Sequence, residues 1–151
     1  MARVQLTKEM ILADKLNPWM PVAQTVREAS RGDKPVKLPQ AALFLQAVTE
    51  TDGAMCNGGW VLALEDYTPM AVRSVEGFRF FELNKHAALV ARALKWFDDL
   101  GPLDDEDPKA EALIEKLNDF DTRYGELDGV TDAVERMVLL YPDRFVFDVE
   151  V

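Results

Sequence analysis

Apolar residues recur at intervals of three and four along most of the chain, which is the period of an α-helix. Residues 85–98 give the clearest case, because Ala87, Val90, Ala93 and Phe97 fall on one broad face. Further helices are expected over residues 8–16, 18–31, 39–51, 68–77, 108–124 and 132–141. The pattern therefore predicts an all-α fold, a single compact domain of six to seven helices spanning residues 1–151.

Capping and helix-breaking residues mark the expected boundaries of these helices. The third helix is apolar on more than one side, which indicates a central position, and Asp52-Gly53 is expected to stop or kink it. Gly77 is expected to interrupt the fourth helix, and Pro142 to end the last one. Three threonines are expected to be N-caps: Thr7, Thr68 and Thr131.

Two segments depart from the helical period. Asn57, Gly58, Gly59 and Trp60 predict a sharp structural turn, because Asn-Gly-Gly tolerates positive φ and permits close backbone approach. Residues 61–64 then continue as a short apolar helix or strand. The C-terminal residues 144–149 alternate weakly between apolar and polar positions, so a short strand and an extended packing arm are both open.

The composition indicates a sizeable hydrophobic core but no catalytic or metal-binding motif. The 151 residues are 48% hydrophobic, which is enough for one domain without disulfides or metal. With Cys56 as the single cysteine and His86 as the single histidine, a disulfide framework and a cysteine-based zinc site are excluded. There is no phosphate-binding loop and no serine nucleophile elbow. We expect a protein that is not an enzyme and needs no cofactor or metal.

The net charge is −10, and it is unevenly distributed. Residues 1–40 hold seven basic and four acidic residues, whereas residues 98–151 hold five basic and seventeen acidic ones. Such a chain repels nucleic acid and anionic membranes and attracts basic proteins. The sequence has neither a signal peptide nor an apolar run of about 20 residues that could span a bilayer, so a cytoplasmic location is expected.

Carboxylates gather at the end of the 85–98 helix, in the loop that follows and on the polar face of the next helix. Within that helix Glu111, Glu115 and Asp119 are spaced by four, so they stack on one face. A solvated face that keeps the protein soluble is the alternative interpretation. The expected partner-binding residues are Asp98, Asp99, Asp104, Asp105, Glu106, Asp107, Glu111, Glu115 and Asp119.

Four short motifs resemble, in order and spacing, a bacterial family of unknown function typified by an acidic DNA-mimic protein. They are the Asn57-Gly58-Gly59-Trp60 turn and the segments 86–90, 117–124 and 138–145. The resemblance covers roughly residues 40–146. Residues 61–66 read Val-Leu-Ala-Leu-Glu-Asp where family members often have Gln and an aromatic-rich stretch, which marks this chain as a divergent member.

The resemblance implies an all-α, acidic homodimer that binds a basic DNA-binding protein in place of duplex DNA, without binding nucleic acid directly. Carboxylates at i and i+4 lie about 6 Å apart along a helix, close to the spacing of phosphates along one DNA strand. Two alternatives remain open at this point. One is an immunity or antitoxin protein that neutralises a basic toxin, and the other is a small-ligand-binding protein with a pocket near residues 57–60.

Overall fold

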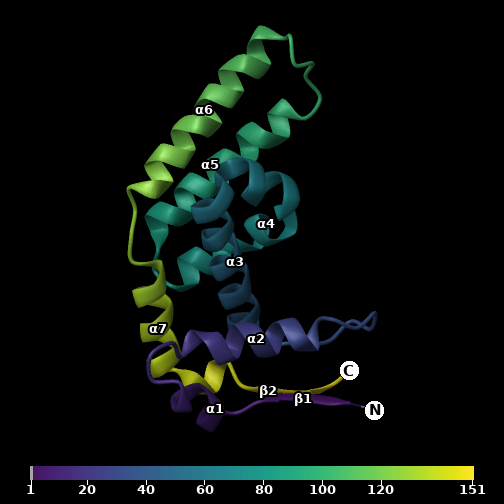
Figure 1. Cartoon of the computed structure of the whole chain (residues 1–151), viewed down its shortest axis with the longest axis vertical. Coiled ribbons are helices and arrows are strands. Elements are labelled where there is room, and N and C mark those ends of the chain that lie inside the picture. Colours follow the sequence, from purple (N-terminus) through teal and green to yellow (C-terminus); the bar gives the residue numbers. More distant parts are fainter. Residues whose placement is uncertain (1) are drawn as a thin grey trace.

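The helix α3 (Gln40–Trp60) is the element around which the others are arranged (Figure 1). It packs against helices on several sides, and its buried residues fall on more than one face. The central position predicted for this segment is therefore confirmed. In the computed structural model, which describes residues 2–151, the chain forms an all-α domain with one small sheet. The elements before α3 are β1 (Arg3–Leu6), α1 (Lys8–Ala13) and α2 (Trp19–Ala29).

After α3 the chain continues as a short π-helix and four further α-helices. The π-helix is η1 (Val61–Asp66), and it leads into α4 (Thr68–Phe80), α5 (Asn84–Leu100), α6 (Pro108–Gly125) and α7 (Val130–Leu140). A single turn of 3-10 helix, η2 (Pro142–Arg144), precedes the last strand, β2 (Phe147–Glu150). The expected number of helices is thus confirmed, and of the two possibilities left open for the C-terminal residues the structure has the short strand.

Two glycines that were expected to break helices lie inside them. Gly77 lies within α4, which runs on to Phe80, because the missing side chain lets α4 approach α3 closely. A Cβ atom on Gly77 would lie 2.8 Å from Val48 Cγ2 and 3.1 Å from the Phe44 carbonyl oxygen. The second, Gly53, lies within α3, where Ala54 and Met55 beside it are buried and hold the helix in place. Tertiary packing overrides glycine's poor helix propensity at both positions.

One of the three predicted N-caps is confirmed. Thr7 caps α1, and its hydroxyl accepts a hydrogen bond of 3.2 Å from the Met10 N–H. Thr68 and Thr131 are instead inside α4 and α7, whose N-caps are Tyr67 and Gly129. Thr68 was misassigned because η1 runs almost directly into α4, so its hydroxyl donates back to the Leu64 carbonyl. At α7, Gly129 takes the left-handed backbone with φ 87°, and no side-chain cap is made there.

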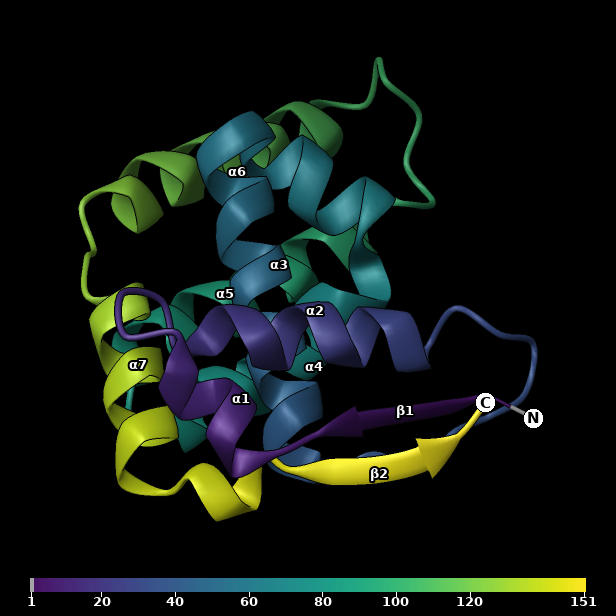
Figure 2. The ribbon, with the colours of Figure 1, turned by 60° about the horizontal axis from the view of Figure 1, so that its bottom comes forward.

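The two ends of the chain pair with each other. β1 and β2 are antiparallel, with Arg3 opposite Glu150 and Leu6 opposite Phe147. The Arg3 guanidinium reaches Asp148 at 2.9 Å and holds the pKa of that carboxyl below its usual range. The N-terminal strand was not predicted, because four residues carry too little pattern on their own. Figure 2 shows this sheet beside α1 and α2, at the end of the molecule opposite α6.

The single histidine is part of the core. His86 is 4% exposed, stacks on Phe78 at 5.4 Å and meets the Tyr124 ring at the same distance. Its Nε2 atom is buried and has no hydrogen-bond partner. Burial lowers the pKa of His86, and the nearby carboxylates Asp52 and Asp128 oppose this effect only in part. The folded state therefore favours the neutral imidazole.

The two helical glycines give a matched pair of stability predictions with opposite signs. Gly77→Ala should lower the free energy of unfolding by about 1–3 kcal/mol, because the new methyl group meets α3. Gly53→Ala should raise it by about 0.5–1 kcal/mol, because a Cβ there meets nothing within 4 Å and alanine favours the helix. Urea unfolding followed by circular dichroism measures both. Equal effects would show that close approach of α3 and α4 is not what requires Gly77.

A second prediction concerns acid stability. Because the folded pKa of His86 lies below the unfolded value of about 6.5, stability is full above that pH and falls as the pH drops through it. Urea midpoints between about pH 7 and pH 5 should therefore decline for the wild type. His86→Leu should flatten this decline, because no imidazole remains to be protonated. An unchanged decline in His86→Leu would assign the acid sensitivity to other groups.

Candidate functional site

All nine acidic residues expected to bind a partner lie on one helical hairpin. We call residues 98–119 the acidic hairpin; it consists of the last turn of α5, the connecting loop and most of α6. Asp98 and Asp99 are exposed at the end of α5, and residues 104–106 are exposed in the loop. Asp107 is half-buried, because its carboxylate caps α6 by accepting a 2.9 Å hydrogen bond from the Lys109 N–H. The hairpin forms the end of the molecule farthest from the sheet (Figure 1).

The remaining three carboxylates lie along the solvent face of α6. The opposite face of this helix is buried through Ala110, Leu117, Phe120 and Tyr124. Helical spacing therefore turns Glu111, Glu115 and Asp119 to solvent, where all three are exposed. We call these three residues the acidic row.

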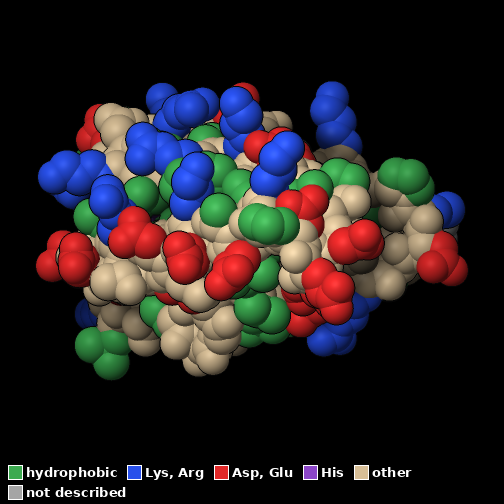
Figure 3. All heavy atoms as spheres, turned by 90° about the horizontal axis from the view of Figure 1, so that it is seen from above, with side chains coloured by type: hydrophobic (Ala, Val, Ile, Leu, Met, Phe, Trp, Pro, Cys, Tyr) green, Lys and Arg blue, Asp and Glu red, His purple; other side chains and the backbone are tan. Residues whose placement is uncertain are grey.

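The acidic row is bordered by cations. Lys109, Lys116 and Arg123 follow one another at every seventh position, so they run along α6 beside the carboxylates. Figure 3 looks onto this end of the molecule and shows acidic side chains in a row, with Lys and Arg side chains gathered along one margin. The Lys116 ammonium lies 5.9 Å from the centre of the Trp96 ring. The surface is thus acidic along its middle and basic along one side.

Among residues 2–151 only one of the nine carboxylates has an ion-pair partner. Asp119 forms an ion pair with Arg123 at 2.8 Å, one turn further along α6. Within residues 2–151 the other eight make no ion pair shorter than 4.0 Å. Their charge is therefore available to a partner.

The predicted turn at residues 57–60 anchors α3 to α6. At Gly59 the backbone takes φ 64° and ψ −155°, a conformation that essentially only glycine adopts. The Trp60 N–H then donates to Asp121 Oδ1 at 2.7 Å, and the Trp60 indole N–H donates to Asn118 Oδ1 at 2.9 Å. A side chain on Gly59 would overlap the Asp121 carboxylate. Of the four residues expected to form a sharp turn, Gly59 alone departs from helical geometry, as a kink inside α3. The hydrogen bonds that follow this kink link the end of α3 to α6.

Burial at this anchor acts on the Asp121 carboxyl. Loss of solvent raises the pKa of Asp121, and the hydrogen bond from the Trp60 N–H lowers it by less. Asp121 is therefore more easily protonated in the folded state than in the unfolded state. The ionised form lowers stability at neutral pH, and that loss disappears as the pH falls below the folded pKa.

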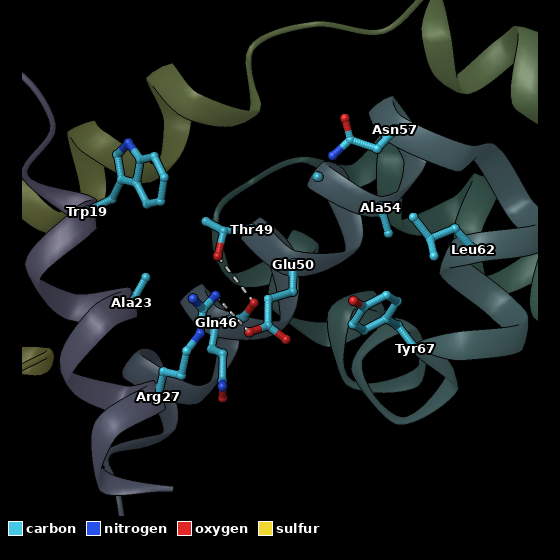
Figure 4. Close-up of a pocket in the computed structure, with 11 residues that line it drawn as sticks. Trp19, Ala23, Arg27, Gln46, Thr49, Glu50, Ala54, Asn57, Leu62 and Tyr67 are labelled. Carbon is cyan, nitrogen blue, oxygen red and sulfur yellow. Dashed lines mark hydrogen bonds and ion pairs between the residues drawn. The ribbon is translucent and has the colours of Figure 1, made fainter. Parts of the chain in front are cut away.

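A cavity of about 550 Å³ lies between α2 and α3 (Figure 4). Of the four turn residues only Asn57 lines it. In its wall the Arg27 guanidinium of α2 and the Glu50 carboxylate of α3 form an ion pair of 3.5 Å. Gln46 lines it too, although it is only 7% exposed. Small residues separate the two helices here, and Trp19 and Tyr67 lie at its sides.

The sequence did not indicate the cavity residues. Arg27 and Glu50 are 23 positions apart on different helices, and no local pattern relates them. The one available signal was Gly53, a glycine in the middle of an apolar helical stretch. The sequence predicts a helix stop or kink there, whereas Gly53 lies inside α3 and lines the cavity.

The described residues offer little chemistry beyond charge and shape. Across residues 2–151 no group of three or more His, Cys, Asp and Glu side chains is arranged to hold a metal ion. Cys56 is exposed as a residue, but partial loss of solvent around its thiol, with the nearby Asp52 carboxylate, raises the pKa of that thiol. A raised pKa disfavours the reactive thiolate. None of the helices in that range combines the length and apolar character needed to cross a membrane.

The fold and the acidic hairpin define an all-α domain with a charged helical surface. Residues 36–141 match the family described as DMP19-like protein, and the chain belongs to that family. A search of curated proteins and a search of solved structures found no match. The matched residues agree with the region of about 40–146 expected from the motifs. They include α3 to α7 and leave β1, α1, α2 and β2 outside.

The anchor at Gly59 gives a prediction for stability. Gly59→Ala should lower the free energy of unfolding by at least about 2 kcal/mol, because alanine disfavours this backbone and meets Asp121. Gly125→Ala is the control, since a Cβ at Gly125 meets nothing within 4 Å. Asp121→Ala should also destabilise, by about 1–3 kcal/mol, because it leaves the Trp60 N–H without an acceptor.

Asp121→Asn separates the charge of this residue from its hydrogen bond. The amide oxygen still accepts from Trp60, and the cost of burying an ionised carboxylate is removed. This variant should be at least as stable as the wild type at pH 7 in urea unfolding. Equal losses in Asp121→Asn and Asp121→Ala would contradict the role of Asp121 as an acceptor for Trp60.

Proposed function

We propose that this chain is a non-enzymatic protein-binding domain whose acidic hairpin occupies the DNA-binding face of a basic protein, as a DNA mimic does. The observation that carries the proposal is the set of eight hairpin carboxylates that make no ion pair within the described residues. Seven of them are exposed, and all eight project from one end of the molecule. A surface of this kind gains most from a partner that supplies cations.

The spacing of the carboxylates supports a partner that recognises nucleic acid. Residues at i and i+4 are displaced by about 6 Å along a helix, so the acidic row repeats charge at an interval close to that of phosphates on one strand. The loop carboxylates at residues 104–106 extend the row beyond the start of α6. Lysines and arginines arranged for phosphates would meet carboxylates at matching positions.

The cations beside the acidic row restrict how such a partner can dock. Lys109 and Lys116 would repel a uniformly basic surface, so the best partner has a basic groove with an acidic or neutral rim. We take the functional unit to be a homodimer, as the resemblance to the DNA-mimic family implies. Two hairpins in one particle would lengthen the acidic surface.

Capture of DNA-binding proteins tests the proposal. Immobilised protein should retain basic DNA-binding proteins from a cell extract at low salt, and duplex DNA should release them. A hairpin variant carries Asp104→Asn, Asp105→Asn, Glu106→Gln, Glu111→Gln and Glu115→Gln. It should retain at least about tenfold less of these proteins, because the charges at the interface are removed. Sedimentation of a captured protein mixed with this chain in solution measures the stoichiometry of the complex.

A control variant removes the same charge from other exposed positions. Its substitutions are Glu9→Gln, Glu28→Gln, Glu65→Gln, Asp66→Asn and Glu76→Gln, all at residues exposed outside the hairpin. Capture by the control variant should stay close to that of the wild type. An equal loss of captured protein in both variants would show that net charge, and not the hairpin, causes the capture. Captured proteins that duplex DNA fails to release would exclude DNA mimicry.

A further inference from the structure

The cavity between α2 and α3 is separate from the surface assigned to protein binding. No residue of the acidic hairpin lines it. Its volume of about 550 Å³ falls in the range of small-molecule sites in proteins, which runs from about 300 to 1,000 Å³. One wall comes from the N-terminal helix α2 and the other from α3, η1 and the residue that follows η1 (Figure 4).

Small residues keep this space open. Ala23 on α2 lies across from Gly53 and Ala54 on α3, so neither helix fills the gap. Gly53 is in the interior of α3, where glycine lowers helix stability. No steric contact requires it, because a Cβ there would meet nothing within 4 Å. A side chain at this position would reduce the volume of the cavity.

Opposite charges meet at one place in the cavity wall. Arg27 and Glu50 are 3.5 Å apart, and their side chains are 62% and 22% exposed. A pair this long and this exposed contributes little to stability, so a ligand can share both groups at small cost. Gln46 lines the cavity one turn before Glu50 on α3, and its amide end is directed away from Glu50 (Figure 4). Its amide offers a donor and an acceptor.

Flat side chains lie on either side of these charges. Trp19 comes from α2, and Tyr67 is the residue that follows η1. The hydroxyl end of Tyr67 is directed toward Glu50 (Figure 4). Indole and phenol rings favour contact with another flat apolar group. The cavity thus offers a cation and an anion together, between aromatic side chains.

We propose that this cavity binds a free α-amino acid with an aromatic side chain. The ligand's carboxylate accepts hydrogen bonds from Arg27, and its ammonium group donates to Glu50. Both charges of an α-amino acid are attached to one carbon, which suits partners only 3.5 Å apart better than the widely separated ends of a peptide do. The aromatic side chain packs against Trp19.

The charge of the whole protein agrees with a ligand of this class. With a net charge of −10, the chain disfavours small anions such as nucleotides. A zwitterion has no net charge and is not repelled. The proposal goes beyond the protein-binding function, since none of its residues belongs to the acidic hairpin.

Three probes that differ by one group test the chemistry. L-phenylalanine carries both charges, phenethylamine lacks the carboxylate and 3-phenylpropionate lacks the ammonium group. Isothermal titration calorimetry should show binding of L-phenylalanine or L-tryptophan at roughly millimolar or lower concentration. Phenethylamine and 3-phenylpropionate should each bind at least about tenfold more weakly than L-phenylalanine, because each can contact only one of the two charged groups of the Arg27–Glu50 pair. Equal binding of either probe would overturn the zwitterion proposal, and so would the absence of binding by both amino acids.

Variants then place the site. Gly53→Leu fills the cavity and should weaken binding at least about tenfold, while Gly53→Ala, which adds one methyl group, should weaken it about threefold or less. Arg27→Gln and Glu50→Gln should each cost at least about tenfold in affinity. Circular dichroism confirms that every variant is folded. Unchanged affinity in Gly53→Leu would exclude this cavity. Capture of DNA-binding proteins should be unaffected in all four variants, so failure here is distinguishable from failure of the protein-binding proposal.

Discussion

The connection between α3 and α6 at Trp60 is the contact on which the rest of the arrangement depends. Gly59 turns the chain sharply, and the backbone N–H that follows reaches the Asp121 carboxylate at 2.7 Å. This hydrogen bond lies where α3 ends and η1 begins, and it links that point to α6, whose buried face packs on the core. The contact between Trp60 and Asp121 therefore helps to orient both the acidic hairpin and η1, which lines one side of the cavity. Neither Trp60 nor Asp121 belongs to the hairpin or lines the cavity.

Much of the fold was predictable because it rests on the helical spacing of apolar residues and on residues that break helices. The apolar spacing of residues 85–98 and 108–124 specified α5 and α6 nearly to their ends, and Pro142 ended α7 as expected. What the pattern missed was decided by distant partners. From the sequence alone Gly77 predicts a helix break, and only the close packing of α4 on α3 explains why glycine is needed inside the helix. The strand β1 forms because β2, more than 140 residues later, supplies its hydrogen bonds. Local propensity carries no information about either contact.

The two candidate sites differ in the same way. The acidic residues could be found from sequence, since they are dense, contiguous and spaced by one helical turn. The cavity could not, because Arg27 becomes a neighbour of Glu50 only when α2 packs on α3. The family match covers α3 to α7 but not α2. One wall of the cavity therefore comes from outside the matched residues, so its chemistry is a property to be established for this chain rather than for its family.

The pairing of the chain's two ends has a mechanical consequence. In the antiparallel sheet, Arg3 pairs with Glu150 at the open end, and the Val151 N–H donates to the Ala2 carbonyl at 3.0 Å just beyond it. A force that separates the ends therefore loads these bonds one after another, as in unzipping, rather than all at once as in shear. The sheet should peel at low force, while α3 to α7 and the acidic hairpin at the opposite end stay folded under the same load.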